Sequence, residues 1–200
     1  MADVFAILAV VAVVGGLWVL VTTARSAFGS AAARTTRERN WMTVLAFAAA
    51  VAIVCTAGSL YLSEVEPIYP PCRYCWFQRI FMYPLAVLLT IGWFRRDRLV
   101  KWYGMPLAAI GGAISTYHVL LERIPALDTG SCDPTNPCTI RWIDKWGGWI
   151  TIPSMALVGF LTILVCLAFV PARTADPSSV TSADQNREQR SDEVPADVAS

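Results

Sequence analysis

Long apolar runs dominate the pattern of hydrophobic and polar positions along the chain. Five runs, residues 4–21, 41–62, 76–94, 102–121 and 150–170, are nearly free of charge. Each is close to the ~20 residues that a helix needs to cross the hydrocarbon core of a bilayer. Only helices and closed barrels satisfy their backbone polar groups in lipid, so the pattern predicts an all-α membrane protein.

Composition supports a membrane protein and sets the C-terminal tail apart. The 200 residues are 56% hydrophobic, and the mean hydropathy is +0.50. A soluble domain could have this composition, but the unbroken runs favour a bilayer. The tail, residues 172–200, has no aromatic residue and carries six acidic against three basic side chains. It cannot bury enough apolar surface to fold, so it is predicted to be a disordered cytoplasmic tail.

The basic residues predict the topology. Residues 25–40, a predicted cytoplasmic linker, hold four arginines, and residues 95–101 hold four more basic residues. The two remaining loops, 63–75 and 122–149, hold four basic residues between them, so the positive-inside rule places these loops outside. No basic stripe with interleaved aromatics is present, which argues against a nucleic-acid partner.

The first run resembles a signal peptide in length. Its start, Met1-Ala2-Asp3, has no basic residue, and its charges follow the apolar stretch. Residues 1–24 are therefore expected to be a retained transmembrane helix whose N-terminus lies outside.

Four of the six cysteines lie in the two external loops, as Cys72-x2-Cys75 and Cys132-x5-Cys138. Two predicted spans separate the pairs, so both pairs return to the same, oxidising side. Redox chemistry, structural disulfides and a four-thiolate zinc site are the alternatives, but the Asp, Pro and Asn residues between Cys132 and Cys138 do not resemble a zinc ribbon, so no metal is expected. Cys55 and Cys166 lie within apolar runs and are expected only to pack.

Arg79 adds a charge to the first pair. Pro70-Pro71 stiffens the approach to the pair, which lies at the positive end of the predicted helix. Arg79 follows Cys75 by one helical turn on the same face, so it is expected to favour a thiolate there. Snorkelling of Arg79 to lipid headgroups is the alternative.

The second loop also favours exchange chemistry. A disulfide between Cys132 and Cys138 closes few residues and adds little stability through loop entropy, which favours a redox role over a structural one. His118, the only histidine, lies near the outer end of its run, with Glu122 one turn later. It can handle protons or hydrogen-bond a redox ligand, or form a structural pair with Glu122.

Together these motifs resemble the disulfide bond formation protein B (DsbB) family, and most closely its compact BdbC branch. The resemblance covers roughly residues 41–170. It rests on Pro-Cys-Arg-Tyr-Cys-Trp-Phe-Gln-Arg-Ile-Phe-Met-Tyr-Pro at 71–84, Tyr-His-Val-Leu-Leu-Glu at 117–122, the pair Cys132-x5-Cys138, and Gly-Gly-Trp-Ile-Thr-Ile-Pro at 147–153.

The resemblance implies a four-helix transmembrane bundle in residues 41–171, to which this chain adds one N-terminal helix. It implies a membrane enzyme that reoxidises an extracytoplasmic thioredoxin-fold thiol oxidase (DsbA-like) and passes the electrons to the membrane quinone pool, menaquinone or ubiquinone. Cys132 and Cys138 would exchange with the partner, Cys72 and Cys75 would form the quinone-side pair, and Arg79 and His118 would lie at the quinone. The first span and the acidic tail have no counterpart in the family.

Two other functions are compatible with paired external cysteines. A vitamin K epoxide reductase-like protein also combines a loop pair with a C-x-x-C motif, but there the loop pair comes first. A non-catalytic membrane scaffold would use both pairs as structural disulfides, which resist mild thiols instead of exchanging.

Overall fold

The computed structural model describes residues 7, 10, 11, 14–19, 21, 31–65, 70–128, 130, 132, 133, 135–141 and 149–171. Its elements are α2 (Ala31–Leu60), a π-helical turn (Tyr61–Val65), α3 (Arg73–Phe94), α4 (Val100–Arg123), a 3-10 turn (Pro125–Leu127) and α5 (Ile152–Phe169). No strand is present within these ranges, and an isolated bridge joins Asp133 to Asn136. The predicted all-α class is confirmed.

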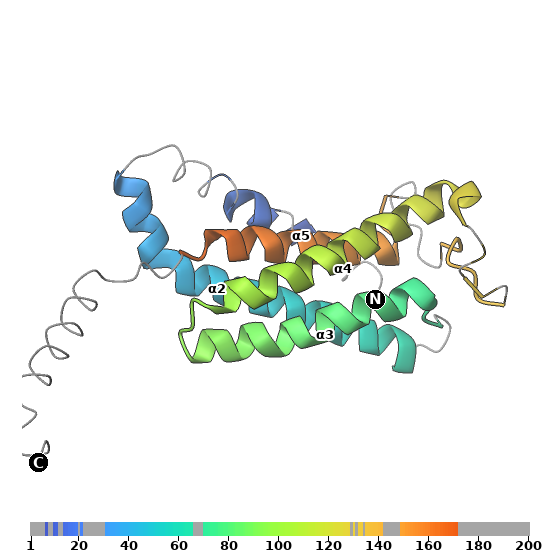
Figure 1. The fold of residues 1–200 in the computed structure, drawn as a ribbon, viewed down its shortest axis with the longest axis horizontal. Helices are drawn as coiled ribbons and strands as arrows, with labels where there is room; N and C mark the ends of the chain where they lie inside the picture. The colour runs from blue at the N-terminus through green and yellow to red at the C-terminus, as the bar shows by residue number, and fades with distance from the viewer. Residues whose placement is uncertain are drawn as a thin grey trace, which may run out of the picture.

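The helices α2–α5 form a four-helix bundle (Figure 1). α2 packs against α3 and α5, and α4 packs against the same two helices. Leu45, Leu85, Leu89 and Phe160 are fully buried in the core. At Gly111 a side chain would come within 2.3 Å of the Phe160 ring, so this glycine lets α4 and α5 approach closely, as small residues do between membrane helices.

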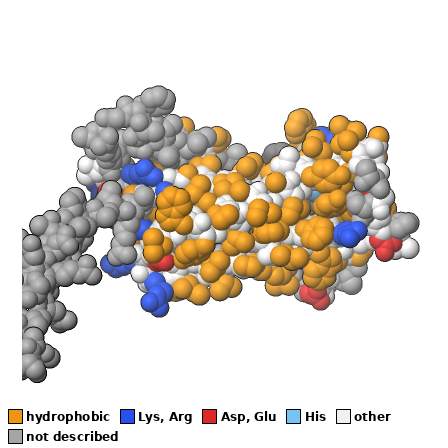
Figure 2. Space-filling model, viewed as in Figure 1, with side chains coloured by type: hydrophobic (Ala, Val, Ile, Leu, Met, Phe, Trp, Pro, Cys, Tyr) orange, Lys and Arg blue, Asp and Glu red, His pale blue; other side chains and the backbone are white. Residues whose placement is uncertain are grey.

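The outside of the bundle is apolar in the middle and charged toward the ends. Figure 2 shows a broad hydrophobic band between the two ends, with Lys and Arg gathered at one of them. Large apolar side chains such as Ile80, Val87, Ile110 and Leu161 point outward from the helices. Since four described helices are also long and apolar enough to cross a bilayer, the chain is a multi-pass membrane protein.

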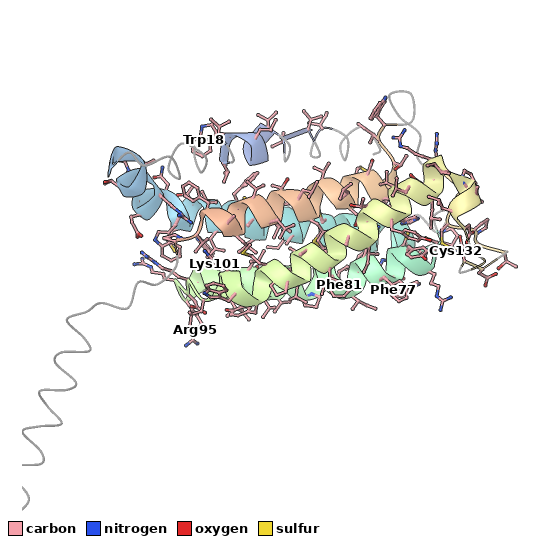
Figure 3. All side chains as sticks on the ribbon, turned by 45° about the horizontal axis from the view of Figure 1, so that its top comes forward. Trp18, Phe77, Phe81, Arg95, Lys101 and Cys132 are labelled. Carbon is pink, nitrogen blue, oxygen red and sulfur yellow. A yellow bond between two sulfur atoms is a disulfide. The ribbon has the colours of Figure 1, made fainter. Side chains whose placement is uncertain are left out.

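Basic residues hold the helix ends together at the end of the bundle away from the cysteines. Arg37 donates to the carbonyls of Ala168 and Phe169, and Lys101 Nζ donates to the Val170 carbonyl at 3.1 Å. These cations lie at the C-terminus of α5, where the helix dipole is negative and carbonyls lack helical partners. Figure 3 shows Arg95 and Lys101 at this end and Cys132 at the other.

The helix bounds follow the apolar runs, with one clear difference. α2 begins at Ala31, ten residues before the apolar run, because the Ala, Arg and Glu residues that precede the run are good helix formers. Residues 31–40 of the predicted linker are therefore helical. The described residues between 7 and 21 are helical too, but a fifth complete span stays a prediction. The tail, residues 172–200, lies outside the described residues.

Candidate thiol–disulfide site

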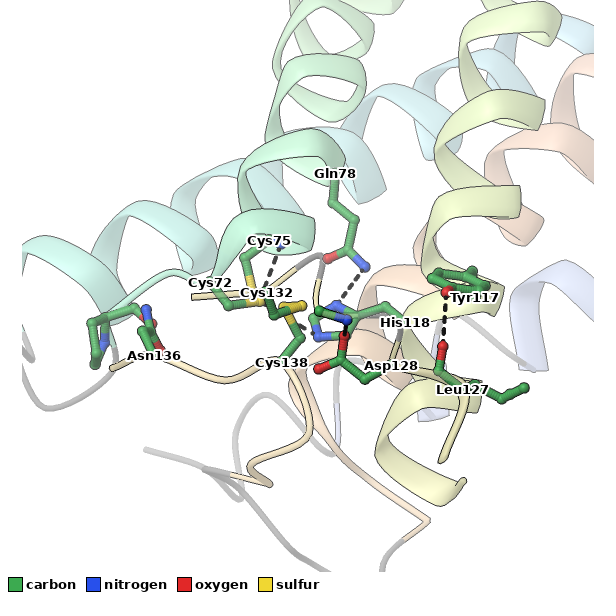
Figure 4. The surroundings of a disulfide bond; sticks show 12 residues. Cys72, Cys75, Gln78, Tyr117, His118, Leu127, Asp128, Cys132, Asn136 and Cys138 are labelled. Atoms are coloured by element: carbon green, nitrogen blue, oxygen red, sulfur yellow. Dashed lines mark hydrogen bonds between the residues drawn. A yellow bond between two sulfur atoms is a disulfide. The ribbon is translucent and has the colours of Figure 1, made fainter. Parts of the chain in front are cut away.

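All four loop cysteines meet at one end of the bundle (Figure 4). Cys72, Cys132 and Cys138 belong to one buried cluster with Leu121, and Cys75 packs against it. The first pair comes from the start of α3 and the second from the loop after α4. The prediction that both pairs lie on the same side of the bundle is confirmed.

The start of α3 positions the first pair. Cys72 is the N-cap residue, with extended backbone angles, and its sulfur accepts a hydrogen bond from the Cys75 backbone N–H at 3.5 Å. The two sulfurs lie 3.1 Å apart as free thiols. A sulfur in the N-cap position faces the unpaired N–H groups of the first turn, an environment that favours a thiolate. The pair is therefore preorganised by helix geometry.

His118 reaches the first pair from α4. Its ring is almost completely buried, with Nε2 lying 3.5 Å from Cys72 Sγ and Nδ1 lying 3.3 Å from the amide nitrogen of Gln78. An amide NH₂ group only donates, so this orientation of Gln78 leaves the proton of the neutral ring on Nε2. That proton faces the sulfur of Cys72. His118 is therefore joined to Cys72 and Gln78. A structural pair with Glu122 was the alternative that the sequence left open.

These contacts make Cys72 an acidic thiol. The hydrogen bond from the Cys75 side chain is the largest influence, and burial opposes it. The hydrogen bond and the electrostatic interaction with His118 act in the same direction as Cys75, and together they lower the pKa of Cys72 from the ordinary 9.0 to about 4. The reduced pair therefore holds a thiolate on Cys72 at neutral pH.

Arg79 is buried one turn beyond Cys75 on α3. Its Nε donates to Ser59 Oγ at 2.9 Å, and its Nη2 donates to the Ser59 carbonyl at 3.0 Å. The guanidinium also lies 5.0 Å from the centre of the Trp76 ring, within the range of a cation–π contact. Nη1 makes no hydrogen bond to a described residue. Ser59 on α2 thus fixes the buried guanidinium inside the bundle, which argues against snorkelling to lipid headgroups.

The second pair is a disulfide in a structured loop. Cys132 and Cys138 are bonded, with their Cα atoms 5.9 Å apart, and both are buried. Asp133 Oδ1 accepts hydrogen bonds from the backbone and side chain of Thr135, which lowers the pKa of Asp133. Asn136 Nδ2 donates to the Pro70 carbonyl at 3.4 Å, so the second loop is tied to the segment that leads into the first pair.

A cavity of about 330 Å³ connects the sulfurs with the interior of the bundle. Cys75, Arg79, His118 and Cys138 contribute to its wall. Most of the remaining wall is apolar and comes from α2, α3 and α5. A largely apolar cavity with a few convergent polar groups is typical of a small-molecule site. A flat aromatic ligand with polar oxygens would find both kinds of contact here.

The same end of the bundle offers a set of metal ligands. Donor atoms of Cys72, Cys75 and His118 lie within 4.8 Å of one another. Thiolates on one tetrahedral zinc ion stand about 3.8 Å apart, given Zn–S bonds of about 2.3 Å. The two sulfurs, at 3.1 Å, are closer than that and face each other as a pair about to form a disulfide does. The geometry therefore favours redox exchange over metal binding.

Two functional contacts were missed by reasoning from the sequence. Ser59 was overlooked as a small polar residue in an apolar run, although Gly58-Ser59 interrupts that run near its outer end. Gln78 belongs to the motif at 71–84 but was not predicted to have a role of its own. Its spacing of three from Cys75 places it on the same helical face, which was a usable signal. Its contact with His118 depends on how α3 and α4 pack, and no local pattern encodes that.

The fold and the site together define a class: multi-pass helical membrane proteins with two interacting cysteine pairs at one end of a bundle. Comparison with known proteins makes the assignment specific. The sequence model described as "Disulfide bond formation protein DsbB" matches residues 38–170. The chain belongs to this family.

Similar proteins come from Bacillus. The chain is 40% identical over 131 residues to "Probable disulfide formation protein C 1" of Bacillus anthracis, a match that covers 65% of this chain and 93% of the relative. It is 39% identical over 127 residues to "Disulfide bond formation protein C" of Bacillus subtilis (strain 168), covering 63% of this chain and 91% of the relative. No solved structure matches the chain. Membership of this family implies a membrane thiol oxidase activity.

Proposed function

We propose that the protein is a quinone-dependent thiol oxidase that regenerates a thioredoxin-fold, disulfide-forming partner outside the cytoplasm. Electrons pass from the partner to Cys132–Cys138, then to Cys72–Cys75, and then to a membrane quinone. The observation that carries this proposal is that both cysteine pairs meet in one cluster, and that Cys72, Cys75 and Cys138 line one largely apolar cavity together with Arg79.

The first step exchanges disulfides with the partner. A partner thiolate attacks the Cys132–Cys138 bond and forms a mixed disulfide. The second thiol of the partner resolves it, leaving the partner oxidised and Cys132 and Cys138 as two thiols. Both cysteines are mostly buried in the free protein, so we expect the partner to displace part of this loop when it binds.

The second step moves the electrons inward. Cys132 and Cys138 reduce a Cys72–Cys75 disulfide by the same chemistry, which restores their own bond and leaves Cys72 and Cys75 as thiols. The described arrangement, with the outer pair bonded and the inner pair free, corresponds to this point in the cycle. Each exchange breaks one disulfide and forms one, so atoms and electrons balance.

The residues around the cavity fit a quinone. When bound, a quinone would supply the oxidant, because it can take up the two electrons released when Cys72 and Cys75 form their disulfide, together with one proton from the Cys75 thiol and one from solvent. Arg79 places a fixed positive charge in the cavity wall, with Nη1 available to an oxygen, and Ser59 and Trp76 hold the guanidinium in place. Nε2–H of His118 stabilises the Cys72 thiolate, and Gln78 keeps the ring in that tautomer.

The same proposal implies how the protein is oriented in the bacterial cell membrane. Arg37, Arg98 and Lys101 gather at the end opposite the cysteines, which supports a cytoplasmic position for that end. The cysteine loops then face the oxidising side. Menaquinone and ubiquinone both have a flat ring with two oxygens, and the choice between them is left to assay.

The proposal is tested by anaerobic mixing of the purified protein with a reduced thioredoxin-fold oxidase and a quinone. Quinone absorbance is expected to fall in step with oxidation of the partner. Replacing Cys72 or Cys75 with Ser should stop the fall, and Cys166→Ala is the matched control, because Cys166 is buried in the core away from the loops. Quinone reduction that persists without Cys72 and Cys75 would refute the proposed route.

A further inference from the structure

The described residues between 7 and 21, which we name the N-terminal segment, have two different faces. Val11, Gly15 and Val19 recur every four residues and therefore share one helical face. Val19 is 2% exposed, whereas Val14 and Trp18, on another face, are 61% and 59% exposed. The segment thus has one face against the bundle and another turned away from it.

Glycines bring the segment close to α2 and α5. A side chain at Gly15 would come within 2.6 Å of the Phe47 ring on α2, and one at Gly16 within 3.3 Å of the Thr162 hydroxyl on α5. Small residues allow this kind of close backbone approach between membrane helices. Figures 1 and 3 both place the segment alongside α5, with Trp18 on its outer side in Figure 3.

The edge of the packed face also reaches the cavity, through Val11, which is 53% exposed. Val11 is part of the cavity wall, as is Phe47, the residue that Gly15 accommodates. The cavity wall therefore includes a residue from outside the four-helix bundle. Cys72, Cys75 and Arg79 line the same cavity.

Two of the matched relatives, from Bacillus anthracis and Bacillus subtilis, leave no room for such a segment. The family model begins to match at residue 38. The 131-residue match to the Bacillus anthracis protein already covers 93% of that relative, so what is unmatched there is too short for a membrane span. The wall that includes Val11 is thus an addition to the matched region.

We infer that the N-terminal segment is a fifth wall of the oxidant cavity and that Val11 helps to select which lipid quinones enter it. This inference rests on the proposed function. An apolar side chain at this position limits the width of the cavity between α2 and α5, so its size sets how well a one-ring or a two-ring quinone fits. Gly15 contacts the Phe47 ring and thereby sets how closely the N-terminal segment approaches α2.

The test replaces Val11 in the full-length protein with Trp. The KM for short-chain menaquinone analogues should rise about tenfold, and that for smaller ubiquinone analogues less, as expected for overpacking a fitted site. Exchange between the Cys132–Cys138 disulfide and a reduced partner, measured without quinone, should not change. Val14→Trp is the matched control: it adds the same bulk to a similarly exposed valine that does not line the cavity.

A second pair of variants tests the packing itself. Gly15→Leu should move the segment or Phe47 and alter the preference between the two quinone rings, whereas Leu17→Ala on the exposed side should not. Equal KM values for the Val11→Trp and Val14→Trp proteins would overturn the inference and leave the proposed function standing. No quinone reduction by the unmodified protein would instead overturn the proposed function.

Discussion

The two cysteine pairs are held by different kinds of structure. Cys72 and Cys75 lie on the first turn of α3, where the N-cap geometry, His118 and Gln78 determine their surroundings. Cys132 and Cys138 lie in a loop that is held by short-range hydrogen bonds and by Asn136. A rigid pair facing an apolar cavity suits a small oxidant, and a loop pair suits exchange with a protein. The difference suggests that each pair is adapted to its own partner.

Removing one sulfur from either pair, in separate variants, should distinguish the two half-reactions, partner exchange and quinone reduction, most clearly. Cys75→Ser should abolish quinone reduction yet leave the Cys132–Cys138 disulfide able to oxidise one equivalent of reduced partner. Cys138→Ser should instead trap a mixed disulfide when it is mixed with the oxidised partner, whose disulfide the Cys132 thiolate attacks, releasing one partner thiol. Non-reducing gel electrophoresis and quinone absorbance measure the two outcomes. Loss of partner exchange in Cys75→Ser would contradict the division of roles.

Changing Arg79 should affect only the reaction of the inner pair, Cys72 and Cys75, with quinone. Arg79→Met removes the cation from the cavity wall and should lower quinone turnover by about a hundredfold to a thousandfold, the size seen when an electrostatic donor is removed from an active site. Partner exchange should stay near normal. Ser59→Ala, which removes one support of the guanidinium, should have a smaller effect in the same direction. Equal losses in both half-reactions would indicate a structural role for Arg79.

The acidity of Cys72 gives a pH test of the inner pair. The folded pKa is lowered from 9.0 to about 4, so Cys72 should be a thiolate above that pH and lose its charge as the pH falls through it. Alkylation of Cys72 in the reduced protein should therefore stay fast well below pH 7. Cys75→Ala should raise the midpoint most, and His118→Ala should raise it by about one unit, the value of one hydrogen bond to a charged group. A midpoint near 9 in the unmodified protein would contradict this assignment.

Removing the hydrogen bond between the two loops should have the smallest effect on the rate of electron transfer. Asn136→Ala removes the hydrogen bond to Pro70 and should slow electron transfer between the pairs about two- to fivefold, in line with ~0.5–1 kcal/mol for one such bond. Thr135→Val is the control, because Thr135 bonds only within its own loop among the described contacts. Stopped-flow measurement of the inter-pair step should distinguish the two variants.

Much of this arrangement could be predicted from the sequence because bilayer helices and cysteine spacing leave strong local signals. The apolar runs predicted α3, α4 and α5 to within a few residues. The two spans between the pairs predicted that the pairs share one side. The start of α2 at Ala31 could not be seen in hydropathy, because polar residues that favour helix extend it beyond the apolar run. Hydropathy reports burial in lipid and not helix length.

The contacts that tune the site were harder to predict. Arg79 was identified by its charge, but its partner Ser59 comes from another helix twenty residues away in sequence. The contact of His118 with Cys72 depends on the packing of α4 against α3. Side chains that meet across helices leave no periodic pattern, so only a three-dimensional structure identifies them.

Direct exchange between the two pairs is the central requirement of the relay. It is tested by leaving one cysteine in each pair, combining Cys75→Ser with either Cys132→Ser or Cys138→Ser, and mapping disulfides by mass spectrometry after mild oxidation. Because Cys72 shares a buried cluster with Cys132 and Cys138, at least one of the two proteins should form an intramolecular bond from Cys72 to the remaining outer cysteine. If both proteins keep these thiols free while they stay folded, the relay is contradicted.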